Sequence, residues 1–197
     1  MKKSNLIISI LVMLIFASLA IGGTPQTQKG SASLFFPFNG LSTLSYDDTY
    51  IGGQYFLMNK VALGMGFGFS SERDKADKDD DPEIDRSFEC DAGIYYYPIQ
   101  KGPVALYIAP QAGMELSSQY LKSVRNCNSR TLWGGLSIGA EWWVIDQISL
   151  SYSTWFGLEY TWGRERIIGS ATTEPRNTKL GIIGSATDCV YISFYFK

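Results

Sequence analysis

The longest regular feature of this chain is an alternation of apolar with small or polar residues between Ile148 and Trp162. Large apolar side chains occupy nearly all the even positions, and serine, glycine, threonine and glutamate occupy every odd position except Trp155. A period of two residues predicts a β-strand with one apolar face. The run is longer than the usual strand of about 5–6 residues, and aromatic residues collect at its end, as they do where a tilted strand leaves a bilayer. We therefore predict a strand that crosses a membrane.

The same alternation recurs along the chain and predicts eight strands. It is clearest between Val61 and Phe69, where large apolar residues alternate with alanine and glycine. Pro110 interrupts one strand, and we expect a bulge or a local irregularity there because proline has no N–H to donate. The predicted strands cover residues 30–38, 50–58, 61–69, 87–97, 104–120, 131–144, 148–162 and 189–196.

The predicted connections alternate between short and long, as in an up-and-down barrel, where every second connection lies at the same rim. An even number of strands places both termini at the rim with short turns. A repeated Ile-Ile-Gly-Ser-Ala-Thr, at 167–172 and 182–187, is interpreted as two arms of a protruding hairpin or a local duplication, in preference to a binding motif. The short turns are 59–60, 98–103 and 145–147, and the long polar loops are 39–49, 72–86, 121–130 and 163–188.

The N-terminus has the features of a secretory signal. Lys2 and Lys3 precede an uninterrupted apolar segment at 6–19, and small residues ending at Ala20 fit a cleavage site. The apolar segment is shorter than the roughly 20 residues of a spanning helix, which makes a membrane anchor the weaker alternative. We predict a signal peptide at 1–20 and a single barrel domain at 21–197, which begins with an exposed leader up to residue 29.

Composition narrows the class of protein further. Charged residues make up 18% of the chain, against about 25% in an average domain. Loss of Lys2 and Lys3 with the signal reduces the 17 basic residues to 15, against 19 acidic ones, so the charge balance does not point to a nucleic-acid partner. The cysteines are odd in number: a pair between Cys127 and Cys189 is conceivable near the long-loop rim, and Cys90 is expected to face lipid and stay free.

Alternation alone does not distinguish a membrane barrel from a secreted, soluble, lipocalin-like barrel. The polar face does: it is mostly glycine, alanine and serine, with no lysine in the strand middles, which suits a crowded lumen better than a surface in water. We therefore predict that the apolar face contacts lipid and the polar face lines the lumen. Aromatic residues edge the apolar face in the manner of membrane girdles, namely Tyr55, Tyr96, Trp142, Tyr152, Tyr160 and Trp162.

Carboxylates and large aromatic residues are predicted inside the barrel. A barrel of about eight strands is just wide enough for side chains to fill, so we expect a closed lumen rather than a small-solute channel. Few cations share the inner positions, so tyrosine, glutamine, serine, or arginines reaching in from the long-loop rim are expected to satisfy the carboxylates. The inner carboxylates are Glu89, Asp91, Glu115, Glu141 and Glu159, and the inner aromatic residues are Tyr95, Tyr107, Trp133 and Trp155.

Catalysis and metal binding are not expected. Paired carboxylates can perform acid–base chemistry, but polar residues that satisfy one another are the usual filling of a small barrel. The chain has no histidine, which removes Ser-His-acid triads and most transition-metal sites. The acidic run at 74–85 lacks the glycine and the final glutamate of an EF-hand calcium loop. We predict a protein that is not an enzyme and has no cofactor and no metal site.

The export signal, the eight alternating strands, the alternating loop lengths and the closing Val-Tyr-Ile-Ser-Phe-Tyr-Phe at 190–196 resemble the small outer-membrane β-barrel family that includes OmpX and the OmpA membrane domain. The resemblance implies a monomer in the lipid of a bacterial outer membrane. In that family an aromatic last strand is the signal read by the barrel assembly machinery, a role that would fall to Phe194 and Phe196. The predicted function is a structural or surface-interaction role, with an extracellular ligand contacted through the long loops. A small-solute channel and a secreted lipocalin-like binding barrel are the alternatives.

Overall fold

The structure is a computed structural model that describes residues 22–38, 48–74, 83–121, 125–167, 173–185 and 190–196. The predicted signal peptide at 1–20 lies outside the described residues. No helix within the described residues has the length and hydropathy needed to cross a membrane. The described residues form nine strands: β1 (Ala32–Phe38), β2 (Asp48–Met58), β3 (Val61–Asp74), β4 (Glu83–Lys101), β5 (Val104–Leu121), β6 (Arg125–Ile145), β7 (Ile148–Ile167), β8 (Thr173–Ser185) and β9 (Val190–Phe196).

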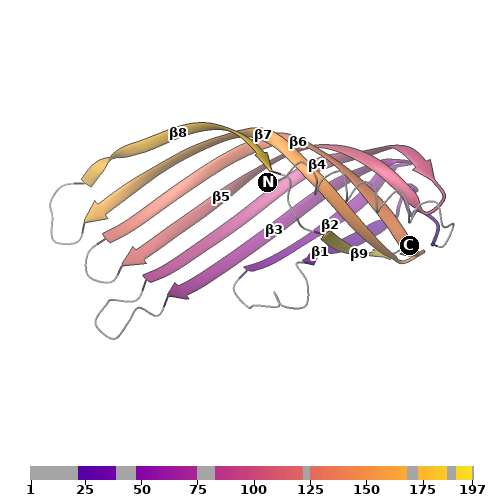
Figure 1. Cartoon of the computed structure of the whole chain (residues 1–197), viewed down its shortest axis with the longest axis horizontal. Helices are drawn as coiled ribbons and strands as arrows, with labels where there is room; N and C mark the ends of the chain where they lie inside the picture. Colours follow the sequence, from indigo (N-terminus) through magenta and orange to yellow (C-terminus); the bar gives the residue numbers. More distant parts are fainter. Residues whose placement is uncertain are drawn as a thin grey trace, which may run out of the picture.

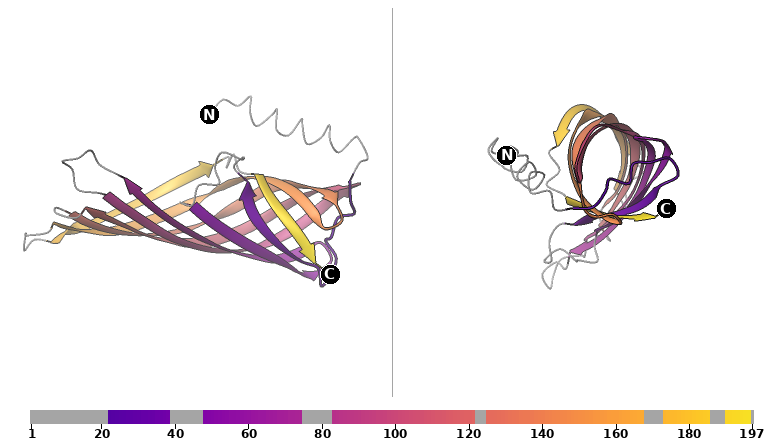
Figure 2. Two further views of the ribbon diagram at one scale, coloured as in Figure 1. Left: turned by 90° about the horizontal axis from the view of Figure 1, so that it is seen from below. Right: turned by 90° about the vertical axis from the view of Figure 1, so that its right-hand side faces the viewer.

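The strands form a closed antiparallel barrel, seen from the side in Figure 1 and end-on in Figure 2. Each strand from β1 to β6 pairs with the next strand along the chain. β9 closes the ring by pairing with β1 from Ala32↔Phe196 to Phe38↔Val190. β7 pairs first with β9 and then, further along, with β8, so β8 and β9 together take the eighth place in the ring. The predicted eight-stranded up-and-down arrangement is confirmed.

Three tight turns lie together at one end of the barrel, as the alternating connections predict. They fall at residues 59–60, 102–103 and 146–147. Lys60 (φ 67°) and Gly102 (φ 57°) adopt the left-handed backbone conformation that tight hairpin turns use. Phe196 and the first described residues also lie at this end, which we call the turn rim, and the opposite end is the loop rim.

The turn predicted at 98–103 is shorter in the structure, because β4 continues through Pro98 to Lys101. The register of β4 against β5 shifts between Tyr96 and Ile99. A bulge is one of the few places in a sheet where a residue without an N–H is tolerated. The prediction that the strand ends at this proline was therefore wrong.

Pro110 does not cause the bulge that its missing donor suggested. β4 pairs with β5 in the same register on either side of it, at Gly93↔Gln111 and Tyr96↔Ile108, and the ladder has a gap between these positions. On the β6 side the ladder is unbroken at Pro110. The expected irregularity is thus a local gap without a shift of register.

Much of the sequence predicted as long loops is strand. β3 runs to Asp74 and β4 begins at Glu83, while only three residues separate Leu121 of β5 from Arg125 of β6. The predicted loop 163–188 contains the end of β7 and the whole of β8. These segments lack a large apolar residue at every second position, so the period that identified the other strands is absent from them.

The repeated Ile-Ile-Gly-Ser-Ala-Thr lies only partly within the described residues, which include Ile167 of the first copy and residues 182–185 of the second. Ile167, the first residue of the first copy, ends β7 and pairs with Arg125 of β6. Ile182, the first residue of the second copy, lies in β8 and pairs with Leu158 of β7. The described residues of the second copy pair with residues 155–158 of β7, which lie outside the first copy.

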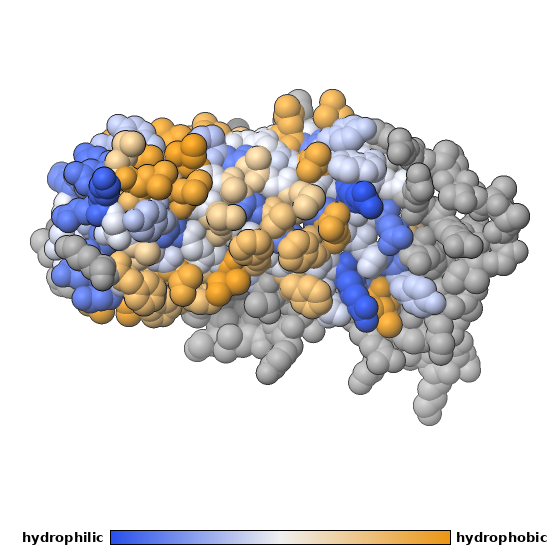
Figure 3. Space-filling model, turned by 180° about the vertical axis from the view of Figure 1, so that it is seen from behind, coloured by the Kyte–Doolittle hydropathy of each residue, from blue (hydrophilic) through white to orange (hydrophobic). Residues whose placement is uncertain are grey.

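The apolar and polar faces point outward and inward as predicted. Leu63 (41% exposed), Leu136 (39%) and Leu158 (55%) project from the outside of the barrel, whereas Ser151 and Gly139 on the other face are buried. Figure 3 shows apolar side chains over the middle of the wall and polar ones at the turn rim. The soluble alternative, in which these leucines form a packed interior, disagrees with this arrangement.

Residues 22–31 lie across the barrel at the turn rim, as Figure 2 shows. The Gly23 N–H donates to the Trp143 carbonyl oxygen at 2.8 Å, and the Lys60 N–H donates to the Thr27 carbonyl oxygen at 2.8 Å. The Thr27 side chain is buried and accepts a hydrogen bond from Gln100. The predicted exposed leader is therefore a bound segment, which we call the strap. Backbone hydrogen bonds hold it, and these leave no hydrophobic pattern in the sequence.

We predict that Gly23→Val releases the strap from the rim. A Cβ at Gly23 would lie 2.1 Å from the Ile145 carbonyl carbon, so a side chain cannot fit without displacing the backbone. Trypsin should then cut after Lys29 about tenfold faster, because cleavage follows the population of the open form. Mass spectrometry of digested barrels measures this rate. Gln28→Ala, at an exposed strap position, is the control, and equal rates in the two variants would contradict the prediction.

Candidate functional site in the barrel lumen

A cavity of about 510 Å³ lies inside the barrel. Side chains therefore do not fill the lumen completely, although the predicted inner residues do lie in it. The cavity wall contains all five predicted carboxylates and all four predicted aromatic residues: Glu89, Asp91 and Tyr95 of β4, Tyr107 and Glu115 of β5, Trp133 and Glu141 of β6, and Trp155 and Glu159 of β7.

Glu141 lies at the turn-rim end of the cavity and is 2% exposed. Its carboxylate accepts hydrogen bonds from the Tyr97 hydroxyl at 2.9 Å, from the Tyr195 hydroxyl at 2.7 Å and from the Ser149 hydroxyl. These donors come from three other strands, β4, β9 and β7. Hydroxyl donors satisfy a buried carboxylate without a cation. The expectation that tyrosine and serine satisfy the inner carboxylates is confirmed for Glu141.

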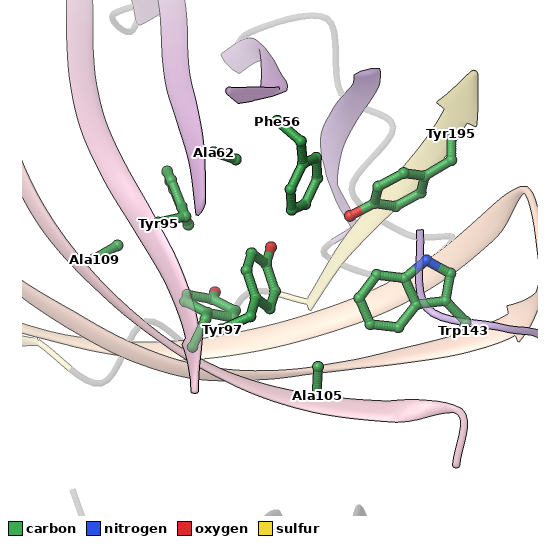
Figure 4. Packing of buried hydrophobic residues seen from close by; sticks show 9 residues of the cluster. Phe56, Ala62, Tyr95, Tyr97, Ala105, Ala109, Trp143 and Tyr195 are labelled. Atoms are coloured by element: carbon green, nitrogen blue, oxygen red, sulfur yellow. The ribbon is translucent and has the colours of Figure 1, made fainter. Parts of the chain in front are cut away.

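A cluster of buried rings closes the lumen at the turn rim, and Figure 4 shows how the rings converge. Phe56 packs on Tyr97 with ring centroids 5.6 Å apart, and Trp143 packs on Tyr195 at 5.5 Å. We call these four residues the floor; all four are fully or almost fully buried. Our sequence reasoning did not single them out. Trp143 lies two residues beyond Glu141, so the alternation already placed both side chains on the same face.

Three carboxylates gather nearer the loop rim, and two of them face each other. Glu89 and Glu115 are direct partners on the paired strands β4 and β5, and Asp91 is close enough for its charge to act on Glu89. The Tyr50 hydroxyl donates to Asp91 Oδ2, and the Trp133 indole hydrogen-bonds to Glu89. Like charges directly opposite on paired strands destabilise a sheet. This part of the lumen therefore differs from the surroundings of Glu141.

No lysine or arginine is among the described residues that line the cavity. Arg86 and Arg130 belong to the same strands but are exposed on the outside of the wall. The charged residues in the described lining are thus all carboxylates, and all of them belong to β4, β5, β6 and β7.

The described cysteines lie away from the cavity lining. Cys90 and Cys127 have free thiols. The expectation that Cys90 stays free is therefore confirmed. Cys189, the conceivable partner of Cys127, lies outside the described residues.

The last strand carries its apolar aromatic residues on the outside. Phe194 and Phe196 are exposed on β9, the strand that closes the ring. The Phe194 ring meets the Phe36 ring of β1 edge-on, with centroids 6.3 Å apart. An assembly role for the two phenylalanines remains a prediction.

No protein-family profile matches the chain, and no curated protein matches it significantly. Among solved structures, it is similar to Neisserial surface protein A (NspA), with 15% identity and a TM-score of 0.44 over 84% of this chain and 94% of that one. It is also similar to the N-terminal β-barrel domain of Pseudomonas aeruginosa OprF, with 9% identity and a TM-score of 0.41 over 85% and 98% of the chains. For Ail, the attachment invasion locus protein of Yersinia pestis, the values are 12% and 0.44 over 86% and 100%. All are small outer-membrane β-barrel proteins, the class that the sequence resembles.

We predict that replacing glutamate by glutamine has opposite effects on stability at the two ends of the lumen. Glu115→Gln removes a like charge opposite Glu89 and is expected to raise the free energy of unfolding by about 0.2–1 kcal/mol. Glu141→Gln weakens three hydrogen bonds to a buried carboxylate and is expected to lower it by about 1–3 kcal/mol. Urea unfolding of the refolded barrel in vesicles measures both. A lower free energy of unfolding in Glu115→Gln would contradict the prediction, because it would show that the carboxylates nearer the loop rim are stabilised by partners.

Proposed function

We propose that this chain is a bacterial outer-membrane β-barrel with a structural or surface-interaction role. The observation that carries the proposal is the inverted distribution of side chains. Large apolar residues cover the outside of the wall, while serines, carboxylates and tyrosines occupy the inside. A protein dissolved in water has no physical reason to expose a continuous apolar belt, because large exposed patches mark contact with lipid or with another protein.

Two tryptophans on the outer face of the belt are separated by a distance that fits the thickness of a bilayer. Toward the turn rim the belt includes Trp142, which pairs with Leu150 of β7, and toward the loop rim it includes Trp162, twelve residues further along β7. At about 3.3 Å per residue and a tilt of about 40°, this distance spans about 30 Å along the barrel axis, the thickness of the hydrocarbon core. Tryptophans at this separation match the two membrane interfaces, where the residue is enriched.

A closed lumen is the second part of the proposal. The floor blocks the turn-rim end with buried rings, and the strap crosses the same end. The cavity is a chamber on the loop-rim side of the floor. A solute would have to displace the floor to pass, which supports a closed barrel over a small-solute channel.

The surface-interaction role is supported by the part of the wall beyond the belt. β6 and β7 continue past Trp162 to Arg125↔Ile167, and β8 extends β7 on its other side. Strands that continue beyond the membrane present a rigid wall on which loops are held outside the cell. We propose that this wall contacts an extracellular ligand, and that the barrel is a monomer whose terminal Phe194 and Phe196 are read by the barrel assembly machinery.

Leu136→Arg tests the lipid contact. Leu136 lies midway along β6 between Arg130 and Trp142, so an arginine there should reduce the free energy of unfolding in bilayers by about 2–4 kcal/mol. Leu136→Phe, which keeps the surface apolar, should change it little. In a barrel that is soluble in water, arginine at this exposed site would be harmless, and such a result would reject the membrane assignment.

Planar-bilayer recording tests the closed lumen. The wild-type barrel should show no stable conductance. A double variant, Tyr97→Ala with Trp143→Ala, removes two rings of the floor and should produce discrete channel openings. Stable currents through the wild-type protein would favour the channel alternative, and a heat-dependent shift of migration on a denaturing gel confirms that each variant is folded.

A further inference from the structure

We propose that the lumen cavity is a binding site for small organic cations, and that linear amines are the class that fits it. At about 510 Å³ the cavity falls within the roughly 300–1,000 Å³ of ordinary ligand pockets. The inference goes beyond the proposed surface role, because it concerns the chamber inside the wall and does not depend on which ligand the loops contact.

The charge of the chamber is the first argument. Glu89 and Glu115 face each other across paired strands, with Asp91 close by. Among the described residues, neither Glu115 nor Glu159 has a hydrogen-bond partner. No described lysine or arginine lines the cavity beside these carboxylates. Like charges at close range repel, and a cation placed among them lowers the energy of the chamber.

The contrast with Glu141 shows that this arrangement is not a general property of the lumen. Three hydroxyls already satisfy Glu141, so a cation gains little there. Nearer the loop rim, the described donors are fewer: the Tyr50 hydroxyl for Asp91 and the Trp133 indole for Glu89. The binding site is therefore placed in the part of the cavity nearer the loop rim, around Glu89, Glu115 and Glu159.

The spacing of the carboxylates favours an organic cation over a metal ion. No group of three or more Asp, Glu, Cys or His side chains among the described residues is close enough to hold a metal ion. Carboxylates spread over β4, β5 and β7 can instead each contact a different ammonium group of a flexible amine. Each ammonium group is a compact charge with several N–H donors, which match carboxylate acceptors.

The aromatic walls add a second kind of recognition. Trp133 and Trp155 pack edge to face, with ring centroids 5.5 Å apart and an angle of 86° between the rings. Trp133 is also the cross-strand partner of Glu159. Tryptophan rings attract organic cations placed within about 6 Å of the ring centre. A carboxylate beside such a ring provides both the charge and the apolar contact that an alkyl ammonium group requires.

The test is isothermal titration of the folded barrel in detergent micelles with spermidine, at constant ionic strength and neutral pH. We expect saturable binding of about one molecule per barrel. The variant E89Q/E115Q should bind at least about tenfold more weakly, since it removes two charges at short range. The matched control E89D/E115D keeps both charges and should stay within about threefold of the wild type. Glu159→Gln gives a second test on a different strand.

The outcomes distinguish binding inside the cavity from binding elsewhere on the barrel. Absence of saturable binding by the folded wild type overturns the proposal. If E89Q/E115Q and Glu159→Gln both bind spermidine as tightly as the wild type, the amine lies on the outer surface, and this result also overturns the proposal. Magnesium chloride that binds as tightly and displaces spermidine would assign the chamber to metal ions instead. Gel migration and circular dichroism report the barrel fold in the same samples, so failure of the barrel assignment is distinguishable from failure of the cation site.

Discussion

Closure of the sheet is the constraint on which the other features depend. Backbone N–H and C=O groups at a free edge cannot be satisfied in hydrocarbon, so a sheet that crosses a membrane has to become a ring. Here the closure is made by β9, which pairs with β1 over its whole length and with the start of β7. The last residues of the chain are therefore structural: without them β1 and β7 would both present free edges. The strap lies at the same rim and adds backbone hydrogen bonds to β2, to the turn at Lys60 and to β6.

An eight-membered ring fixes a narrow lumen, and aromatic–glycine pairs determine its shape. A Cβ at Gly139 would lie 2.3 Å from the ring of Tyr107, its cross-strand partner. A Cβ at Gly113 would lie 2.5 Å from Trp133, which it faces in the same way. Small inner residues are thus not only a response to crowding. They leave room for a ring on the neighbouring strand to lie against the wall. The cavity is the space that remains between these rings and the floor.

The sequence predicted those strands whose outer and inner faces lie in different surroundings. Where one face meets an apolar surrounding and the other meets a packed lumen, the period of two residues is strong, as in 61–69 and 148–162. It also placed the five inner carboxylates correctly. It failed for β8 and for the loop-rim ends of β3, β4, β6 and β7, where large apolar residues do not alternate. It also failed for the strap, which is held by main-chain atoms. Partners such as Tyr195 depend on the register of distant strands, which no local pattern contains.

The lumen contains two electrostatic environments that differ in what they do for the fold. Glu141 joins β4, β6, β7 and β9 through three hydroxyl donors, so its charge is part of what holds the turn rim together. The pair Glu89 and Glu115 joins two strands that are already paired, and its charges repel. The role of Glu141 in joining strands explains why a carboxylate is present there. Packing does not explain the pair Glu89 and Glu115, because glutamine or serine would fill the same space without repulsion. The proposed cationic ligand would attract both carboxylates, and the cavity of about 510 Å³ above the floor has room for it.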